Sequence, residues 1–234
     1  MRKLPVSLLF FLSFLGVLKA QESPVGAWKS ISGRSTSILL ITPSWFTVTD
    51  YSDKTFLASY GGTWKPAGNG EAEVTVYYNT ANGEQAGQSA HVPIGIINGQ
   101  LQTSGPGGGQ QIWTRLDNGA GSLAGNWMIT AREKDGKKNP VPDGPRQTFK
   151  LLTGTRFQWV AINVQTGEFF GSGGGTYTFE EGLYKEKIEF FSRDSSRVGT
   201  VLSFKGKVTG NEWDHSGVST KGDPIHETWS RNQD

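Results

Sequence analysis

The sequence predicts an all-β protein, made of two tandem small antiparallel up-and-down β-barrels after a signal peptide. Short runs of alternating apolar and polar residues recur between Gly, Asn and Asp turns, and no window shows sustained helical periodicity. The chain also repeats itself, because residues 60–64 and 73–78 correspond to residues 173–177 and 186–191 at one constant offset. A duplication of this kind predicts two copies of one folding unit.

The first 20 residues have the composition of a secretory signal peptide. Arg2 and Lys3 give it a positive start, residues 6–17 form an apolar core too short to span a bilayer, and Ala20 is the expected cleavage point. A membrane anchor is the alternative, and the short core argues against it. No other segment approaches membrane-spanning length, so we expect a secreted or periplasmic protein without membrane insertion after signal cleavage.

Cysteine content and charge exclude several classes of function. The chain has no cysteine, which excludes disulfides, thiol catalysis, thiolate metal ligands and a lipid-modified cysteine at the processing site. Residues 1–20 hold three of the 23 Lys and Arg residues and none of the 21 Asp and Glu. The mature chain therefore has 20 basic and 21 acidic residues, a net charge of −1. This balance gives no reason to expect nucleic acid or an anionic membrane as a partner.

The first unit, residues 21–118, has eight runs with the pattern of short strands. They are residues 37–41, 45–50, 56–60, 63–66, 72–79, 91–97, 101–103 and 110–116. Residues 116–123, rich in Asn, Gly and Ser, join this unit to the second one, residues 119–234.

The second unit shows nine candidate strands separated by hairpin turns. They are residues 125–132, 147–152, 156–163, 168–171, 176–180, 183–192, 198–208, 212–219 and 225–231. The polar residues 133–146, with three prolines and three lysines, are expected to form a long loop over one barrel end. This many short strands in about 110 residues suits a closed barrel, and closure removes the exposed sheet edges.

Two local motifs suggest chemistry that their context does not support. Residues 171–175 are rich in glycine but lack the Gly-Lys-Ser/Thr of a phosphate loop and precede a strand, so they predict a bulged strand. Asp214, His215 and Ser216 look like a catalytic triad. On a strand, however, His215 faces away from both neighbours, so the three side chains do not share one site.

Each unit opens with a Gly-x-Trp motif and has an arginine just after its last strand. Trp28 with Arg115 forms one such set, and Trp127 with Arg231 forms the other. The pattern resembles that of the lipocalin and calycin superfamily, in which the arginine packs across the tryptophan and closes the barrel base. The resemblance implies a cation–π contact worth roughly 0.5–2 kcal/mol in each barrel.

The second unit also resembles, over nearly its whole length, a group of uncharacterised secreted lipocalin-like proteins of bacteria. The strings that carry this likeness are RFQW at 156–159, GGGTY at 173–177, IEFFSR at 188–193 and WDHSG at 213–217. That group brings no assigned activity with it. The resemblance therefore implies a barrel fold and secretion without naming a function.

Strand alternation predicts which side chains face the interior of the second barrel. The residues expected to point inward are Tyr184, Glu186, Ile188, Phe190, Leu202, Phe204, Val208, Trp213, His215, Ile225, Glu227, Trp229 and Arg231. The expected ligand-binding residues are Trp159, Tyr184, Glu186, Phe204, Trp213, His215 and Glu227. No catalytic or metal-ligating residue is assigned.

Two buried carboxylates beside a histidine need an explanation, because buried charges are costly unless they are paired. One is a hydrogen-bonded brace, in which His215 bridges Glu186 and Glu227 and Arg231 is the counter-ion. Another is a polar anchor at the bottom of a ligand pocket. A haem or metal site through His215 is the third, and otherwise we expect no cofactor.

The first unit departs from this set of polar residues. The repeat aligns Glu73 with Glu186 and Gln111 with Glu227, and the strand at 98–103 offers no histidine. Either the first copy has changed its role in binding, or it braces its barrel with a neutral residue.

The leading functional hypothesis is non-covalent binding of a small, partly apolar molecule in the second barrel. Aromatic walls would bury it, and Glu186, His215 and Glu227 would recognise its polar end. The alternatives are an enzyme with a Glu–His acid–base pair inside the barrel and a structural or protein-interaction module with filled barrels. An open cavity reaching a histidine of perturbed titration would favour the enzyme. The sequence does not identify the ligand or the oligomeric state.

Overall fold

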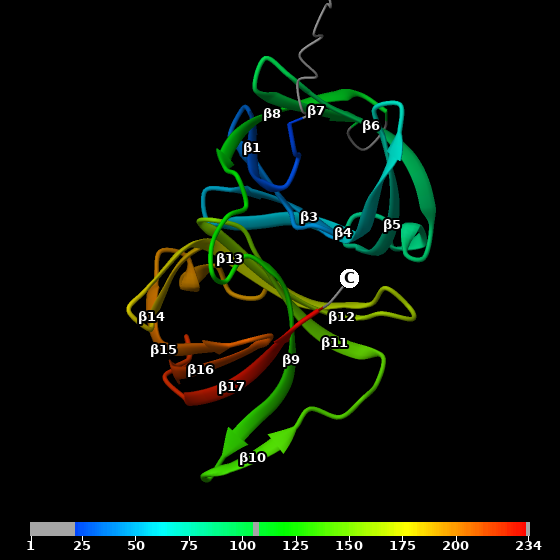
Figure 1. Cartoon of the computed structure of the whole chain (residues 1–234). Helices are drawn as coiled ribbons and strands as arrows, with labels where there is room; N and C mark the ends of the chain where they lie inside the picture. Colours follow the sequence, from blue (N-terminus) through cyan, green and yellow to red (C-terminus); the bar gives the residue numbers. More distant parts are fainter. Residues whose placement is uncertain (1–21, 105–107, 233–234) are drawn as a thin grey trace, which may run out of the picture.

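The structure, a computed structural model, describes residues 22–104 and 108–232. They form seventeen strands and two 3-10 turns, η1 (Gly83–Gln85) and η2 (Ser195–Arg197). The signal peptide expected at residues 1–20 lies outside the described residues. Within the described ranges, no helix is long and apolar enough to cross a membrane. The fold class predicted from the sequence is confirmed, because the strands form two closed antiparallel barrels (Figure 1).

The first barrel is an up-and-down meander of eight strands, closed by pairing of the first with the last. Its strands are β1 (Gly26–Ser32), β2 (Ser35–Ile41), β3 (Trp45–Ser52), β4 (Thr55–Gly68), β5 (Glu71–Asn79), β6 (Ser89–Ile97), β7 (Gln100–Ser104) and β8 (Gln110–Asp117). Alternating apolar side chains from these strands, among them Trp28, Leu101 and Trp113, fill the part of the interior next to the barrel base.

The second barrel repeats this meander and is closed by pairing of β9 with β17. Its strands are β9 (Gly125–Lys134), β11 (Arg146–Leu152), β12 (Arg156–Asn163), β13 (Phe169–Glu180), β14 (Leu183–Phe191), β15 (Val201–Thr209), β16 (Glu212–Val218) and β17 (Pro224–Arg231). An added strand, β10 (Lys137–Pro140), pairs with the far half of β9.

The prediction of a long loop at residues 133–146 is wrong for its first half. Strand β9 continues to Lys134 and returns as β10, and this hairpin projects from the barrel (Figure 1). The two residues at the turn, Asp135 and Gly136, have φ of 54° and 72°. Positive φ at both central residues is the geometry of a type I′ turn, which Asp-Gly favours.

The glycine-rich strings of the repeat lie in two long strands, opposite bulges of the strands that follow. Residues 56–60 and 63–66 belong to the single strand β4, and residues 169–171 and 176–180 belong to β13. The pairing with the next strand shifts at Gly61/Gly62 and at Gly174/Gly175, where the extra residues are Tyr77 of β5 and Glu189 of β14. The bulged strand expected at residues 171–175 is confirmed, because β13 has an extra residue of its own, Phe170, in its pairing with β12. Both barrels therefore use the same device at the same place.

The bulge changes which side chains of β14 face the interior. Gly174 pairs with Phe190 and Gly175 pairs with Ile188, so Glu189 is the extra residue. Phe191 therefore joins Ile188 on the interior face. Phe190 faces the first barrel, where its ring stacks on Tyr51 at a centroid distance of 5.6 Å. The prediction that Phe190 points into the barrel is wrong, because strict alternation fails at a bulge.

An arginine lies over a buried tryptophan at the base of each barrel. The guanidinium carbon of Arg115 lies 3.9 Å from the ring centroid of Trp28, and that of Arg231 lies 4.3 Å from Trp127. Both indole rings are fully buried. These are the two pairs that the Gly-x-Trp and terminal arginine pattern predicts.

The two barrels pack side by side through the outer faces of their first strands (Figure 1). Leu151, Val160 and Ile162 of the second barrel share one apolar cluster with Ile38 and Leu40 of the first.

Within this apolar contact, the side-chain amide of Gln158 enters the first barrel's outer face. It accepts hydrogen bonds from Thr47 and Thr49 at 3.1 and 2.9 Å and donates to Ser59 at 3.1 Å. A satisfied polar group at the centre of an apolar contact fixes the orientation of the two barrels.

Candidate functional site

The interior of the second barrel contains an open cavity of about 310 Å³. Five of the seven expected ligand-binding residues line it, namely Trp159, Glu186, Phe204, His215 and Glu227. The other two, Tyr184 and Trp213, are fully buried and lie behind this wall, where both rings contact His215. The structure thus brings all seven residues into one region of the barrel.

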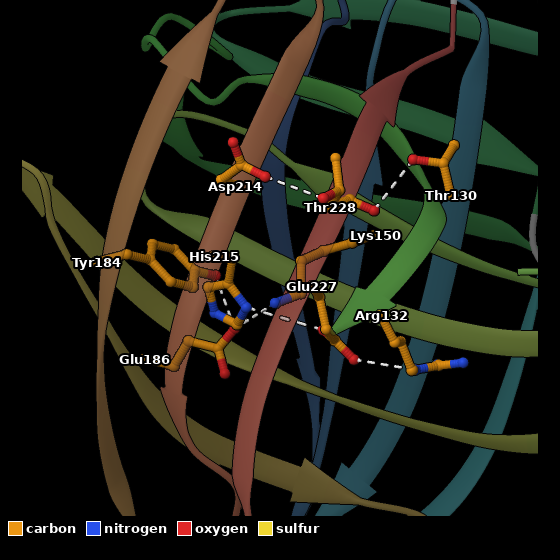
Figure 2. A network of polar contacts seen from close by, with 9 residues as sticks. All are labelled: Thr130, Arg132, Lys150, Tyr184, Glu186, Asp214, His215, Glu227 and Thr228. Atoms are coloured by element: carbon orange, nitrogen blue, oxygen red, sulfur yellow. Dashed lines mark hydrogen bonds and ion pairs between the residues drawn. The ribbon is translucent and has the colours of Figure 1, made fainter. Parts of the chain in front are cut away.

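A buried ion pair lies at the inner end of the cavity (Figure 2). The Nζ atom of Lys150 on β11 lies 2.6 Å from Oε1 of Glu186 on β14, and their side chains are only 5% and 6% exposed. The hydroxyl of Tyr184 donates to the same oxygen at 2.8 Å. Burial, and then the Glu186 charge, raise the pKa of Tyr184 well above its ordinary value, so the phenol stays a donor. Charge and hydrogen bonds together compensate the burial of the carboxylate.

The counter-ion of Glu186 is Lys150, and the prediction that Arg231 has this role is wrong. Arg231 lies at the barrel base and donates to the carbonyl oxygens of Ala124 and Ser122. The ammonium of Lys150 instead lies within 5.5 Å of four aromatic rings, those of Phe157, Tyr184, Trp213 and Trp229. Such rings attract a desolvated cation and lower the cost of its burial.

Lys150 was missed in the sequence because β11 is buried on both faces. Its neighbours Phe149 and Leu151 pack between the barrels, so the apolar residues of this strand point away from the interior. The available signal was the pairing of the strand with β9, where Lys150 lies opposite the fully buried Trp127.

His215 on β16 is a buried ring without hydrogen bonds. The ring is 2% exposed and packs on Phe204 at a centroid distance of 4.1 Å. Its Nδ1 lies 3.8 Å from Oε2 of Glu227, too far for a hydrogen bond, and neither ring nitrogen has a partner among the described residues. Burial lowers the pKa of His215, and the nearby Glu227 offsets this only in part, so the imidazole is neutral at pH 7. A brace in which His215 bridges the two acids is therefore not formed.

Glu227 on β17 is an ionised carboxylate at the side of the cavity. Its Oε1 accepts from Nε of Arg132 at 3.4 Å (Figure 2). Burial acts to raise the pKa of Glu227, but the His215 ring and the charges of Lys150 and Arg132 outweigh it, so the pKa is lowered. Asp214 lies on the opposite face of β16, where it accepts from Thr228 at 2.9 Å, so no Asp–His pair forms there.

Two further arginines line the cavity and were not anticipated from the sequence. The guanidinium carbon of Arg146 lies 4.6 Å above the ring of Phe170, and Arg193 donates to the Phe170 carbonyl oxygen. Within residues 22–104 and 108–232, neither arginine forms an ion pair with a carboxylate. Because Glu186 and Glu227 are engaged by Lys150 and Arg132, the uncompensated charge of this cavity is positive.

The described residues contain no group of three or more His, Asp and Glu side chains placed to hold a metal ion. Across the ranges that the structure describes, Glu227 is the one carboxylate that forms an ion-pair contact with the His215 ring. The alternative of a metal or haem site through His215 therefore gains no support from its surroundings.

No protein-family model matches this chain, and no curated protein matches it either. The side chains that the barrels bring together therefore carry the evidence for function.

Proposed function

We propose that this chain is a lipocalin-like binding protein whose second barrel holds a small, partly apolar molecule. The observation that supports this most directly is the His215 ring, buried at the wall of an open cavity, whose two nitrogens have no hydrogen-bond partner in the described part of the chain. A buried polar group without a partner costs about 1–3 kcal/mol. A ligand that supplies the missing hydrogen bond recovers this energy as affinity.

The cavity walls indicate the chemistry of the ligand. Trp159, Phe191 and Phe204 offer aromatic surface for an apolar part of the ligand. The cavity volume of about 310 Å³ is at the lower end of the range for ligand pockets. Trp229 lines the same cavity, and its buried indole nitrogen also lacks a hydrogen-bond partner among the described residues. A neutral imidazole N–H and an indole N–H are both donors, so they suit a ligand with an oxygen acceptor.

Two exposed arginines that line the cavity favour an acidic group on the ligand. Arg146 and Arg193 present guanidinium groups to the cavity without carboxylate partners in the described part of the chain. Guanidinium groups bind carboxylates and phosphates through charge-assisted hydrogen bonds. We therefore assign the second barrel an amphipathic ligand with an aromatic or aliphatic body and an anionic end.

A calorimetric titration with 2-naphthoate, an aromatic carboxylate of suitable size, tests the proposal. The wild-type chain binds the probe, and His215→Phe weakens binding about tenfold, which corresponds to 1.4 kcal/mol. Phenylalanine keeps the ring packed on Phe204 and removes only the nitrogens. His226→Phe is the matched control, because that ring lies on the outer face of β17. Its Nδ1 atom is 2.7 Å from Oε2 of Glu133. Equal affinity in wild type and His215→Phe would refute the pocket role.

An enzyme is the second candidate function, and two observations favour it. The open cavity reaches His215, and burial keeps that ring neutral beside the ionised Glu227. A neutral imidazole next to a carboxylate can take a proton from a bound molecule. Native mass spectrometry of protein purified from its own host separates the candidates. A retained molecule whose mass changes on incubation, but not in Glu227→Gln, shows turnover, and an unchanged mass supports binding alone.

A module with filled barrels is the candidate that the interior favours least. The second barrel encloses the cavity described above, and the first barrel also contains one, of about 250 Å³. Well-packed protein interiors have few voids larger than a water molecule.

A further inference from the structure

The cavity of the first barrel lies inside the strands at the end opposite the Trp28–Arg115 pair. Its walls are apolar, with Leu39, Val48, Trp64 and Val92 among the lining residues. None of the described residues that line it is an Asp, Glu, Lys, Arg or His. This contrasts with the second cavity, which is lined by six such charged residues and His215.

Strand register shows which residues of the first barrel occupy the positions of the ion pair in the second barrel. Trp127 of β9 pairs with Lys150, and the equivalent Trp28 of β1 pairs with Leu39. Tyr177 of β13 pairs with Glu186, whereas Trp64 of β4 pairs with Val74. Leu39 and Val74 thus occupy the positions of Lys150 and Glu186.

This register corrects the alignment of Glu73 with Glu186 that the sequence repeat suggests. The β4–β5 pairing has a second register shift, between Pro66 and Gly68, which the β13–β14 pairing lacks. This extra residue changes the offset between the repeats by one, so Val74 faces the interior. Glu73 lies on the outside of the barrel, where its carboxylate is 3.1 Å from Nζ of Lys65.

The remaining polar groups are replaced in the same way. Phe179 pairs with Tyr184, and the equivalent Pro66 pairs with Ala72. His215 pairs with Glu227, whereas Thr103 pairs with Gln111. Ala72, at the position of Tyr184, lines the cavity of the first barrel.

Neutral polar residues surround the cavity of the first barrel at its open end. They are Asn79, Gln85, Gln88, Ser89, Thr103 and Ser104. The indole N–H groups of the walls already have partners, since Trp64 donates to the Thr42 carbonyl at 2.8 Å and Trp113 to the Thr103 hydroxyl at 3.0 Å. A charged ligand buried here would have no counter-ion among the described lining residues, and that is costly.

We infer that the first barrel is a second, separate binding site for an uncharged, mostly apolar molecule. An engineered cavity of about 150 Å³ binds benzene, so a cavity of about 250 Å³ suits roughly ten non-hydrogen atoms by proportion. A single hydroxyl or carbonyl group on the ligand would meet the amides and hydroxyls at the open end. The duplication therefore gave one chain two barrels that select ligands of different charge.

The test compares 2-naphthol, which is uncharged at pH 7, with 2-naphthoate in calorimetric titrations of the full chain. Ala72→Phe fills the first cavity with a ring at the position that Tyr184 occupies in the second barrel. Ala161→Phe, a matched change, fills the second cavity, because Ala161 lines it. Ala72→Phe weakens binding of 2-naphthol at least tenfold and leaves 2-naphthoate unchanged, and Ala161→Phe has the reverse effect.

Several outcomes would overturn the inference. It fails if the wild-type chain does not bind 2-naphthol, if Ala161→Phe and not Ala72→Phe abolishes that binding, or if Ala72→Phe also abolishes binding of 2-naphthoate. Should Ala72→Phe prevent folding, as judged by circular dichroism, Ala90→Trp replaces it, since Ala90 is exposed at the cavity opening. Binding of 2-naphthol without binding of 2-naphthoate would count against the second barrel's function and support this site.

Discussion

Lys150 and Glu186 form a direct hydrogen-bonded ion pair inside the second barrel, with Nζ 2.6 Å from Oε1. Loss of one partner leaves an uncompensated buried charge, so Lys150→Met lowers the free energy of unfolding by about 3–5 kcal/mol. The double variant Lys150→Met/Glu186→Leu removes both charges and recovers most of this loss. Urea unfolding of the two variants measures the difference.

The two changes are not additive if this account is correct, because the residues are in contact. A double variant that is less stable than either single variant would show that the pair is not the reason for the loss. Lys65→Met is the control, since Lys65 pairs with Glu73 on the exposed surface, where such pairs contribute little.

The titration of His215 makes stability depend on pH. Its folded pKa lies below the ordinary value of 6.5, so as the pH falls the unfolded chain takes up the proton first. Stability is therefore full above about pH 6.5 and decreases below it, by up to about 1.4 kcal/mol per pH unit. Glu227 has a lowered pKa and acts in the same direction, but only below about pH 4.5.

Unfolding in urea at pH 7.5, 6.5 and 5.5 checks this dependence. The loss of stability between pH 6.5 and 5.5 is smaller in His215→Phe than in wild type. His91 and His226 are present in both proteins, so their contributions cancel. An identical loss in both proteins would mean that burial, with the charges of Lys150, Glu186 and Glu227 nearby, does not lower the pKa of His215 in the folded chain.

Local sequence patterns were sufficient for most of the strands and for the tryptophan–arginine pairs at the barrel bases, but they missed β10 and divided β4 and β13 in two. The period of two along a strand is a local property, and the Gly-x-Trp motif marks the start of each meander. The bulges were harder to place, because one extra residue reverses all later side chains of the strand. That is why Phe190 was assigned to the interior and why Glu73 was aligned with Glu186.

The candidate site was predicted in part, and the omission of Lys150 has a physical cause. Glu186, His215 and Glu227 lie on β14, β16 and β17, where outward residues are polar and alternation is clear. Lys150 lies on β11, where the outer face is also buried because the barrels contact each other there. The sequences of the two halves, considered separately, do not indicate which outer faces of the barrels contact each other.

Gln158 gives a test of how the two barrels are held together. Gln158→Leu removes the amide that bonds to Thr47, Thr49 and Ser59, and it leaves buried hydroxyl groups with fewer partners. We expect the free energy of unfolding to fall by about 2 kcal/mol. Gln165→Leu is the control, since Gln165 is exposed in the turn between β12 and β13. Thermal unfolding measures the free energy of unfolding of both variants. A difference of less than about 0.5 kcal/mol between them would contradict a role for the amide in the interface.

The equivalent bulge glycines Gly62 and Gly175 explain why the two halves share a Gly-Gly-Thr string. A Cβ atom on Gly62 would lie 1.9 Å from the carbonyl oxygen of Thr75, and one on Gly175 would lie 2.0 Å from that of Lys187. Both contacts are with backbone, which cannot move aside without breaking the strand pairing. Gly62→Ala and Gly175→Ala therefore destabilise the chain by about 3 kcal/mol each, as overpacking in a core does.

Gly95→Ala is the matched control for these two variants. Gly95 also lies in a strand, β6, and a Cβ atom there would meet nothing within 4 Å. We expect that variant to stay within about 0.5 kcal/mol of wild type in urea unfolding. A small effect at Gly62 together with a large one at Gly175 would show that only the second barrel needs the close approach at its bulge. The repeated string would then reflect common ancestry of the halves and not a shared requirement of their geometry.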